Sequence, residues 1–222
     1  KNGISSFGNG VSGQFGAIVK LKNLRLGFSY DSPQYIEIED ETKQSLTSTY
    51  LDQGSIIKET IDPGILNIYD SYQLSLPSKK MLSIAYIFGV RGLISIDYAT
   101  QNAANTVLTR EWNSKYLDEL SNTFLNSFQS IQTFKIGGEY RLKDISLRAG
   151  YLKRNNAQRN IIDSDQAITF GLGFNFGSNS MSLSFVQLNE NKEFNMFSEG
   201  LNDSYTLSNS INRLCLSYNI KL

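Results

Sequence analysis

Strict alternation of large apolar and small side chains is the feature that most constrains this chain. In the stretch AITFGLGFNFG (167–177), every second position is occupied by Ile168, Phe170, Leu172, Phe174 or Phe176. The positions between them carry only threonine, glycine and asparagine. Because successive side chains of a β-strand point to opposite faces, this pattern predicts a strand with one apolar face and one nearly empty face.

Alternation of this kind recurs along the chain in nine segments. They are 13–21, 24–30, 72–88, 94–98, 134–142, 145–151, 167–177, 181–185 and 214–222. We interpret 72–88 as one long strand that is interrupted at Pro77, where proline cannot donate a hydrogen bond to the ladder. A different spacing, typical of a helix, relates Leu117, Leu120, Phe124 and Phe128 within a long connection.

The connections between these segments alternate in length. Short turns are expected at 22–23, 89–92, 143–144 and 177–180, and long links at 33–66, 102–130, 155–165 and 190–203. Outer-membrane barrels show this asymmetry, with short periplasmic turns and long extracellular loops. The large apolar side chains then face lipid and the small ones face the lumen. The tyrosines of the apolar set near strand ends would form an aromatic girdle: Tyr30, Tyr86, Tyr98, Tyr140, Tyr151 and Tyr218.

We therefore predict an all-β fold, an antiparallel transmembrane β-barrel of the outer membrane, with residues 1–222 forming part of a single barrel domain. A soluble β-sandwich or a lipocalin-like barrel, whose apolar face is simply its core, is the alternative. If the short turns are periplasmic, nine strands begin outside the cell, whereas closed bacterial barrels have an even strand number and periplasmic termini. We expect that an N-terminal portion of the barrel precedes these strands.

Composition excludes several classes of function. Lysine plus arginine equals aspartate plus glutamate at 21 each, which gives no basic face for nucleic acid. The chain has no histidine and one cysteine, Cys215, which removes histidine-based catalysis, thiolate zinc sites and disulfides. No enzyme, cofactor or metal site is expected. An acidic run, Glu37, Glu39, Asp40 and Glu41, offers calcium ligands, although a solvated loop is the favoured interpretation.

Four stretches resemble a known family. They are LKNLRLGFSYDSP (21–33), YQLSLPSKKMLSIAYIF (72–88), FKIGGEYRLKDISLRAGY (134–151) and ITFGLGFNF (168–176). These stretches resemble the FadL/TodX family of outer-membrane transporters for long-chain fatty acids and other hydrophobic compounds, in its Bacteroidota-like branch. The resemblance covers roughly residues 10–222, and the GxEYRL…LRAGY hairpin is its most specific part. It implies that the nine strands are the sixth to fourteenth of a fourteen-stranded barrel.

The resemblance also implies passive uptake. A hydrophobic ligand lands in a groove among the extracellular loops, passes to a pocket in the lumen and leaves sideways through the wall after an N-terminal plug shifts. Candidate groove contacts, chosen for chemistry and loop position, are Tyr35, Ile36, Tyr50, Leu51, Ile56 and Ile57, together with Leu117, Leu120, Phe124 and Phe128 of the expected helix. The alternative is that these residues pack their own loops over the barrel mouth.

A fatty-acid carboxylate requires a cation in the lumen. The lumen-facing positions offer Arg25, Lys135, Arg141 and Arg148, with Glu139 as a neighbour. A salt-bridge network within the lumen is the alternative role for these side chains. The expected partners are hydrophobic small molecules, lipid or detergent, and the outer membrane itself. A competing function is that of a non-transporting barrel subunit in an outer-membrane export or assembly complex, which binds protein partners.

Overall fold

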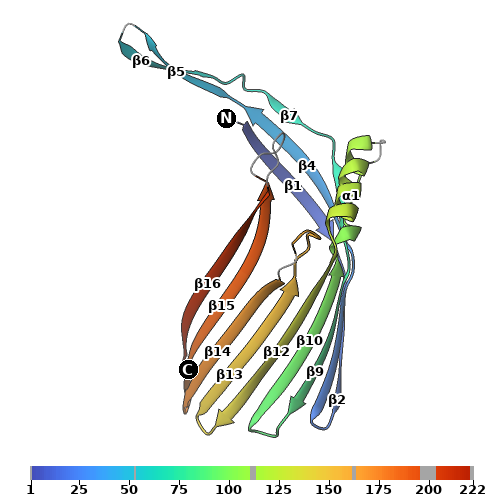
Figure 1. Cartoon of the computed structure of the whole chain (residues 1–222), viewed down its shortest axis with the longest axis vertical. Helices are drawn as coiled ribbons and strands as arrows, with labels where there is room; N and C mark the ends of the chain where they lie inside the picture. Colours follow the sequence, from blue (N-terminus) through green and yellow to red (C-terminus); the bar gives the residue numbers. More distant parts are fainter. Residues whose placement is uncertain (1, 53, 111–113, 162–163, 196–203, 221–222) are drawn as a thin grey trace.

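Nine antiparallel strands form a continuous wall in this computed structural model, which describes residues 2–52, 54–110, 114–161, 164–195 and 204–220. The strand order is β16-β15-β14-β13-β12-β10-β9-β3-β2, and Figure 1 shows them side by side. Their bounds are β2 Gln14–Leu21, β3 Leu24–Asp31, β9 Lys79–Ile87, β10 Gly92–Asn102, β12 Ser130–Leu142, β13 Ile145–Asn155, β14 Ser164–Phe176, β15 Asn179–Asn195 and β16 Ser204–Asn219. Each predicted segment contributes one strand to this wall.

The wall is open at both edges. Neither β2 nor β16 has a second neighbour among the described residues, and every side chain of β2 is exposed. An unpaired edge leaves a row of backbone N–H and C=O groups without ladder partners. The nine strands therefore do not close on one another.

All four short turns lie together at one end of the wall, here called the turn end (Figure 1). Three of them are two-residue hairpin loops, at 22–23, 143–144 and 177–178. Lys22 and Lys143 have positive φ angles of 48° and 53° there. Such angles belong to primed turns, whose twist matches that of the flanking strands. The predicted short turns are confirmed.

The two faces of the wall differ as the alternation predicts. On β14, Ile168 is 42% exposed and Phe170 57%, whereas Asp165 and Ala167 on the other parity are buried at 7% and 8%. The register extends both sets across neighbouring strands. We call one surface the apolar face: Leu26, Ile84, Ile94, Ile136, Leu147, Phe170, Leu183 and Leu216. The other is the polar face: Gly27, Ser83, Ser95, Gly137, Gly150, Thr169, Val186 and Arg213.

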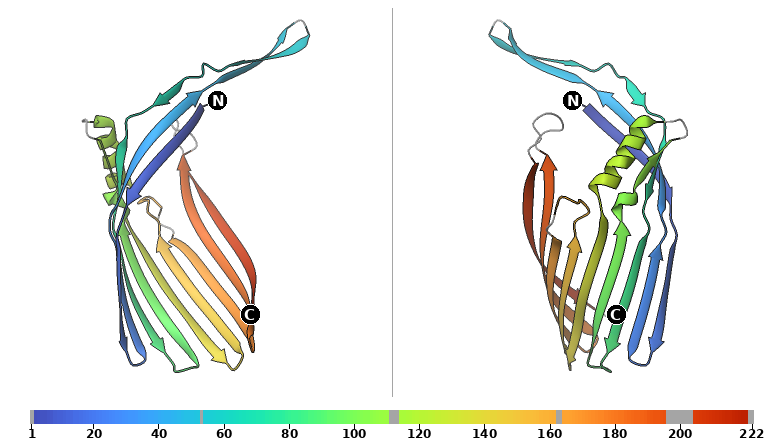
Figure 2. Two further views of the ribbon diagram at one scale, coloured as in Figure 1. Left: turned by 180° about the vertical axis from the view of Figure 1, so that it is seen from behind. Right: turned by 45° about the vertical axis from the view of Figure 1, so that its right-hand side comes forward.

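Beyond the wall, a second antiparallel sheet continues its strands. This extension sheet contains β1 Asn2–Val11, β4 Gln34–Gln44, β8 Tyr72–Leu76 and β11 Val107–Thr109, with β7 Leu66–Ile68 paired to β4. A hairpin of β5 Leu46–Asp52 and β6 Ser55–Ile61 projects farther from the wall in all three views (Figures 1 and 2). The expected long link 33–66 is thus largely strand.

Two prolines mark the boundary between wall and extension sheet. The pairs Asp31↔Lys79 and Gln34↔Leu76 place Pro33 opposite Pro77. Since proline has no backbone N–H, both strands lose pairing at the same level. At the same level, Ser32 N donates to Gly13 O, between β1 and β2, over 2.8 Å. The interruption predicted at Pro77 is confirmed. The two halves of the segment 72–88, β8 and β9, belong to different sheets.

The helix predicted in the third long link is present as α1, Lys115–Ser127. The side chain of Ser114 caps it by accepting from Leu117 N over 3.4 Å. A short 3₁₀ turn, η1 Ala103–Asn105, precedes it. In the part of the chain that the structure describes, no helix combines the length and apolarity needed to cross a bilayer.

The last long link is shorter than expected. Strand β15 continues to Asn195 and β16 begins at Ser204, where the sequence predicted a loop over 190–203. Residues 196–203, and Leu222 of the predicted last strand, lie outside the described residues.

Candidate functional site

An ionic cluster occupies the polar face near the turn end. Arg148 Nε donates to Glu139 Oε2 over 2.7 Å, and Arg141 Nε donates to Glu139 Oε1. Glu139 and Arg148 are register partners on β12 and β13, and Arg141 follows Glu139 by two residues on the same face. We call these three residues the arginine cluster. One carboxylate serves two guanidinium groups, so the cluster carries one excess positive charge.

Exposure in the arginine cluster is uneven. The Glu139 side chain is 15% exposed, whereas those of Arg141 and Arg148 are 57% and 46% exposed. The carboxylate is thus covered by its partners while both guanidinium groups keep free N–H donors toward the polar face. Such donors can bind a carboxylate from solution.

Glycines on β14 provide the space in which Arg148 lies. Gly171 is its register partner, and a Cβ atom built there would lie 3.3 Å from Arg148 Cβ. A Cβ atom at Gly173 would lie 3.5 Å from Arg148 Nη1. The nearly empty face of AITFGLGFNFG therefore accommodates an arginine side chain from the neighbouring strand.

The other two candidate cations lie apart from this cluster. Arg25 Nη1 donates to the carbonyl oxygens of Lys22 and Leu24 over 2.6 and 3.0 Å, so it holds the β2–β3 turn. Lys135 is the register partner of Asp97 on β10. Among the described residues, Lys135 forms no ion pair within 4.0 Å. Two of the four predicted lumen cations are thus brought together.

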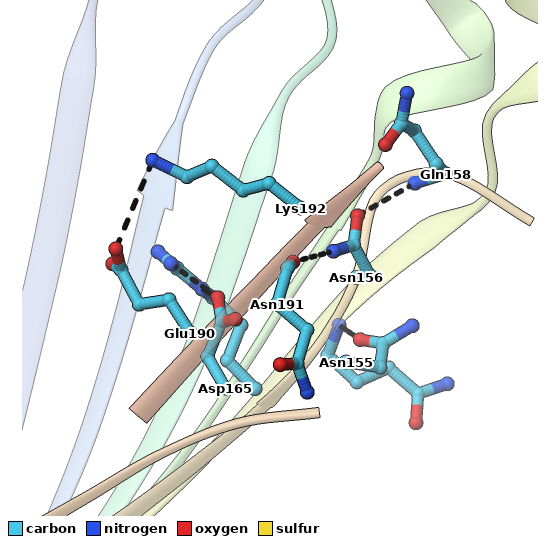
Figure 3. Close-up of polar contacts among 9 residues, drawn as sticks. Asn155, Asn156, Gln158, Asp165, Glu190, Asn191 and Lys192 are labelled. Carbon is cyan, nitrogen blue, oxygen red and sulfur yellow. Dashed lines mark hydrogen bonds and ion pairs between the residues drawn. The ribbon is translucent and has the colours of Figure 1, made fainter. Parts of the chain in front are cut away.

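A second polar cluster connects β13, β14 and β15 through hydrogen bonds and ion pairs at the end of the wall away from the turns (Figure 3). Arg154 donates to Asp165 Oδ2 through Nε and Nη2 over 3.1 and 2.7 Å. Asn156 Nδ2 donates to Asn191 O over 2.9 Å, and Lys192 Nζ lies 3.7 Å from Glu190 Oε2. Sequence reasoning missed this cluster, whose signal is a run of polar residues on the polar parity of three strands.

The loop candidates fall into separate places. Tyr35 and Ile36 are consecutive on β4 and so point to opposite faces of the extension sheet. Tyr35 lines a pocket of about 360 Å³ at the level of Pro33 and Pro77, together with Lys80 and Asn102.

The remaining strand candidates lie on the projecting hairpin. Tyr50 pairs with Ile57, and Leu51 with Ile56. Leu51 is 73% exposed and Ile56 is 75% exposed. The four residues are adjacent to one another and lie away from the wall (Figure 1).

The helix candidates pack onto the extension sheet. Leu117 is 7% exposed, and α1 contacts η1 and β11. Ser121 Oγ accepts from Leu108 N over 2.9 Å and so fixes the helix on β11. Phe124 and Phe128 contact each other with ring centroids 5.4 Å apart, and Leu120 is half-buried. The side chain of Leu117 is therefore buried against the extension sheet and is not exposed to a ligand.

An apolar hollow of about 950 Å³ lies in the apolar face of the wall, and sequence reasoning missed it. Its centre is the register pair Gly138 and Ala149, where large side chains are replaced by small ones. Its border includes Ile94, Ile136, Tyr140, Leu147, Tyr151 and Phe170. The signal was two small residues of the apolar parity, which become neighbours once the strands are paired.

The acidic run on β4 does not form a metal centre in the described part of the chain, where no group of three potential ligands is close enough to hold an ion. Asp40 instead affects Tyr72 on the neighbouring strand β8. Burial and the nearby Asp40 carboxylate raise the pKa of the Tyr72 phenol above its usual value of 10.0.

No protein-family model and no curated protein matches this sequence. Solved structures do. The toluene transporter TodX of Pseudomonas putida matches with a TM-score of 0.51 and 18% identity, over 93% of this chain and 48% of TodX. The CymD monoaromatic hydrocarbon channel matches with a TM-score of 0.53 and 12% identity, over 96% of this chain and 51% of CymD. The chain spans about half the length of these proteins.

This likeness shows the fold. The chain has the all-β architecture of an antiparallel transmembrane β-barrel of the outer-membrane type, and its nine strands form part of such a wall. The soluble sandwich is not the fold. The resemblance to the FadL/TodX family is supported at this level, that of the fold.

Proposed function

We propose that this chain forms the wall of a passive route for hydrophobic compounds across the outer membrane, with long-chain fatty acids as the substrate class. The single observation that carries the proposal is the arginine cluster, which presents excess positive charge beside the glycines of β14 on the polar face. The fold of TodX and CymD supports the general class, because both are described as proteins that pass apolar compounds.

The cluster suits the polar end of a fatty acid. A guanidinium group can bind a carboxylate through paired N–H donors, and Arg148 already makes one hydrogen bond to Glu139 through Nε. A ligand carboxylate would share Arg141 and Arg148 with Glu139 and neutralise their excess charge.

Entry from outside is proposed to use the extension sheet. Tyr35 lines the 360 Å³ pocket at the level of Pro33 and Pro77, and Ile36 is its neighbour on β4. The helix residues Leu120, Phe124 and Phe128 offer apolar surface beside the wall, because Phe128 lies just before β12. The exposed residues of the projecting hairpin, Tyr50, Leu51, Ile56 and Ile57, offer it farther out.

Binding of a labelled long-chain fatty acid to the protein in outer-membrane vesicles tests the proposal. Replacing both cluster arginines, Arg141→Ala with Arg148→Ala, is expected to weaken fatty-acid binding at least 10-fold, since each lost charge-assisted hydrogen bond contributes about 1.5–3 kcal/mol. Toluene, which has no carboxylate, should bind equally to both proteins. Lys153→Ala is the matched control, because Lys153 lies on β13 with the opposite parity to Arg148. Unchanged fatty-acid binding in the double variant would contradict the role of the cluster.

We also propose that further strands complete the barrel at the edges of β2 and β16, and that these nine strands are the last nine of fourteen. The unpaired edges support this proposal, because in lipid an unpaired backbone N–H costs several kcal/mol. Amide exchange in the membrane tests it. Protection of β2 and β16 amides equal to that of β14 is expected, and rapid exchange along both edges would contradict closure.

One observation favours the second candidate function, a barrel subunit of an export or assembly complex. The β5–β6 hairpin projects from the extension sheet with Leu51 and Ile56 more than 70% exposed. Exposed apolar groups on a protruding element are suited to a protein partner. Leu51→Ser with Ile56→Ser separates the two functions. Loss of cross-linking to a co-purifying partner with unchanged fatty-acid binding would support the partner surface, whereas weaker fatty-acid binding with cross-linking unchanged would support the entry groove.

A further inference from the structure

The apolar hollow lies on the face of the wall opposite the lumen, so a transport route through the lumen does not pass through it. Its large apolar side chains belong to the apolar face, which the fold directs toward lipid, and Glu139 and Arg148 also contribute to its lining. Gly138 and Ala149 are register partners, and Ile94 and Phe170 flank them on the neighbouring strands. Two adjacent small residues thus open a gap in a surface otherwise covered by large side chains.

The depth of the hollow matches one leaflet of a bilayer. Gly138 precedes Lys143 of the turn by five residues, and Ala149 follows Asp144 by five. At about 3.3 Å per residue and a tilt of roughly 40°, this places the pair about 13 Å from the turn end. One leaflet of the hydrocarbon core is about 15 Å thick, half of the total. An acyl chain anchored at the turn end would therefore reach the hollow.

Cations lie where the head group of such a lipid would lie. Arg91 and Lys143 are exposed residues of adjacent turns. Arg141 N donates to Arg91 O over 2.6 Å, which holds the two turns together. Arg91 N also donates to the carbonyl oxygen of Phe88, which lines the hollow. The cationic pair is thus connected to the turn-side border of the apolar hollow.

Charge is distributed unequally between the two ends of the molecule. The turns and the positions next to them carry Lys20, Lys22, Arg25, Arg91, Arg141, Lys143 and a single acid, Asp144. The extension sheet carries the acidic run of β4 instead. The excess of cations attracts a phosphate-bearing lipid to the turn end.

We propose that the wall binds one anionic phospholipid of the turn-side leaflet, with its phosphate at Arg91 and Lys143 and an acyl chain in the apolar hollow. The apolar lining binds the acyl chain, and the cationic border binds the phosphate of the same lipid molecule. The proposal depends on the membrane-spanning wall. Although Glu139 and Arg148 also line the hollow, Arg91 and Lys143 are not residues of the arginine cluster, so substitutions at these two positions test lipid binding separately from transport.

Lipid retention measured by native mass spectrometry tests this site. The protein is taken from vesicles of phosphatidylcholine containing a minor fraction of phosphatidylglycerol. Retention of one phosphatidylglycerol, in preference to the more abundant zwitterionic lipid, is expected. Arg91→Ala with Lys143→Ala should weaken retention roughly 30-fold, since each cation near the lipid surface contributes about a 5-fold factor. Lys22→Ala, in a turn that does not border the hollow, is the control and should retain the lipid.

Filling the hollow is the second arm. Ala149→Leu should abolish retention, whereas Ala17→Leu, on the apolar face of β2 away from the hollow, should not. A photoactivatable acyl chain on phosphatidylglycerol should label β12 to β14 in the unaltered protein, which tests the site even if Ala149→Leu fails to fold. Equal retention of both lipids, labelling elsewhere on the wall, or a retained second copy of the chain in place of lipid would each overturn the proposal.

Discussion

Arg148 of β13 lies against Gly173 of β14, where a Cβ atom would stand 3.5 Å from the arginine Nη1. The same guanidinium group bonds to Glu139 on the other neighbouring strand. Three adjacent strands are therefore linked on the polar face by one side chain, which lies against the glycines of β14 and bonds to β12. This relationship explains why large apolar residues in β14 alternate with glycine.

Replacing Gly173 with valine should displace the Arg148 side chain and break its bond to Glu139. The branched side chain would occupy the volume next to Nη1, and overpacking of this kind costs about 1–3 kcal/mol. The measurement is the free energy of unfolding in detergent micelles. Gly16→Val is the matched control, because a Cβ atom at Gly16 on the polar face of β2 would meet its nearest atom at 3.7 Å, the carbonyl oxygen of Phe28. Equal destabilisation by both variants would show that Arg148 does not depend on Gly173.

The assignment of the two faces predicts that substitution by arginine destabilises the protein to very different extents at two neighbouring positions. Ile96→Arg on the apolar face of β10 should destabilise the inserted protein by about 2–4 kcal/mol, the cost of arginine at the bilayer midplane. Ser95→Arg, one residue earlier on the polar face, should have a much smaller effect. Folding into vesicles at increasing urea concentration measures both. A larger cost at Ser95 than at Ile96 would reverse the assignment.

The strands of the wall could be predicted because, in a membrane, large apolar side chains alternate strictly with small or polar ones along each strand. In β4 the same period is harder to detect. Ile36 and Ile38 alternate with acids, but Asp40 then stands where the next apolar residue is expected. Both faces of the extension sheet can meet water, so nothing enforces alternation there. The segment was therefore assigned to a loop although it forms strands.

The arginine cluster was partly predictable for the same reason. Parity alone places Glu139 and Arg141 on one face, and a two-residue turn at 143–144 sets the register that brings Arg148 opposite Glu139. The apolar hollow depends on the register of several strands at once. The same turn also pairs Gly138 with Ala149, but nothing in the sequence shows that Ile94 and Phe170 flank this pair on the neighbouring strands.

Tyr72 should titrate at a higher pH than an unperturbed tyrosine. Burial and the Asp40 carboxylate both disfavour the phenolate, so the folded protein holds the proton more tightly than the unfolded chain. The stability linked to this proton is fully present below the unfolded pKa and is lost as pH rises through the higher folded value. Phenolate absorbance, taken as the difference between the parent protein and Tyr72→Phe, measures it. Asp40→Asn should lower the pKa of Tyr72, whereas Glu39→Gln, on the opposite face of β4, should leave it unchanged. An equal effect of both would contradict the role of Asp40.

Cys215 gives a probe of the polar face that needs no added cysteine. It is the register partner of Ser184, is exposed, and is the chain's single cysteine. If the polar face borders a water-filled lumen, a membrane-impermeant maleimide should modify Cys215 in vesicles. Leu216→Cys in a Cys215→Ser background moves the thiol to the apolar face on the same strand, where Leu216 pairs with Leu183. That thiol should resist the impermeant reagent and react with a lipid-soluble one, because lipid excludes the charged reagent and suppresses the thiolate. Mass spectrometry of the labelled protein measures both, and modification of the 216 thiol before the 215 thiol would show that the apolar face is the one in contact with water.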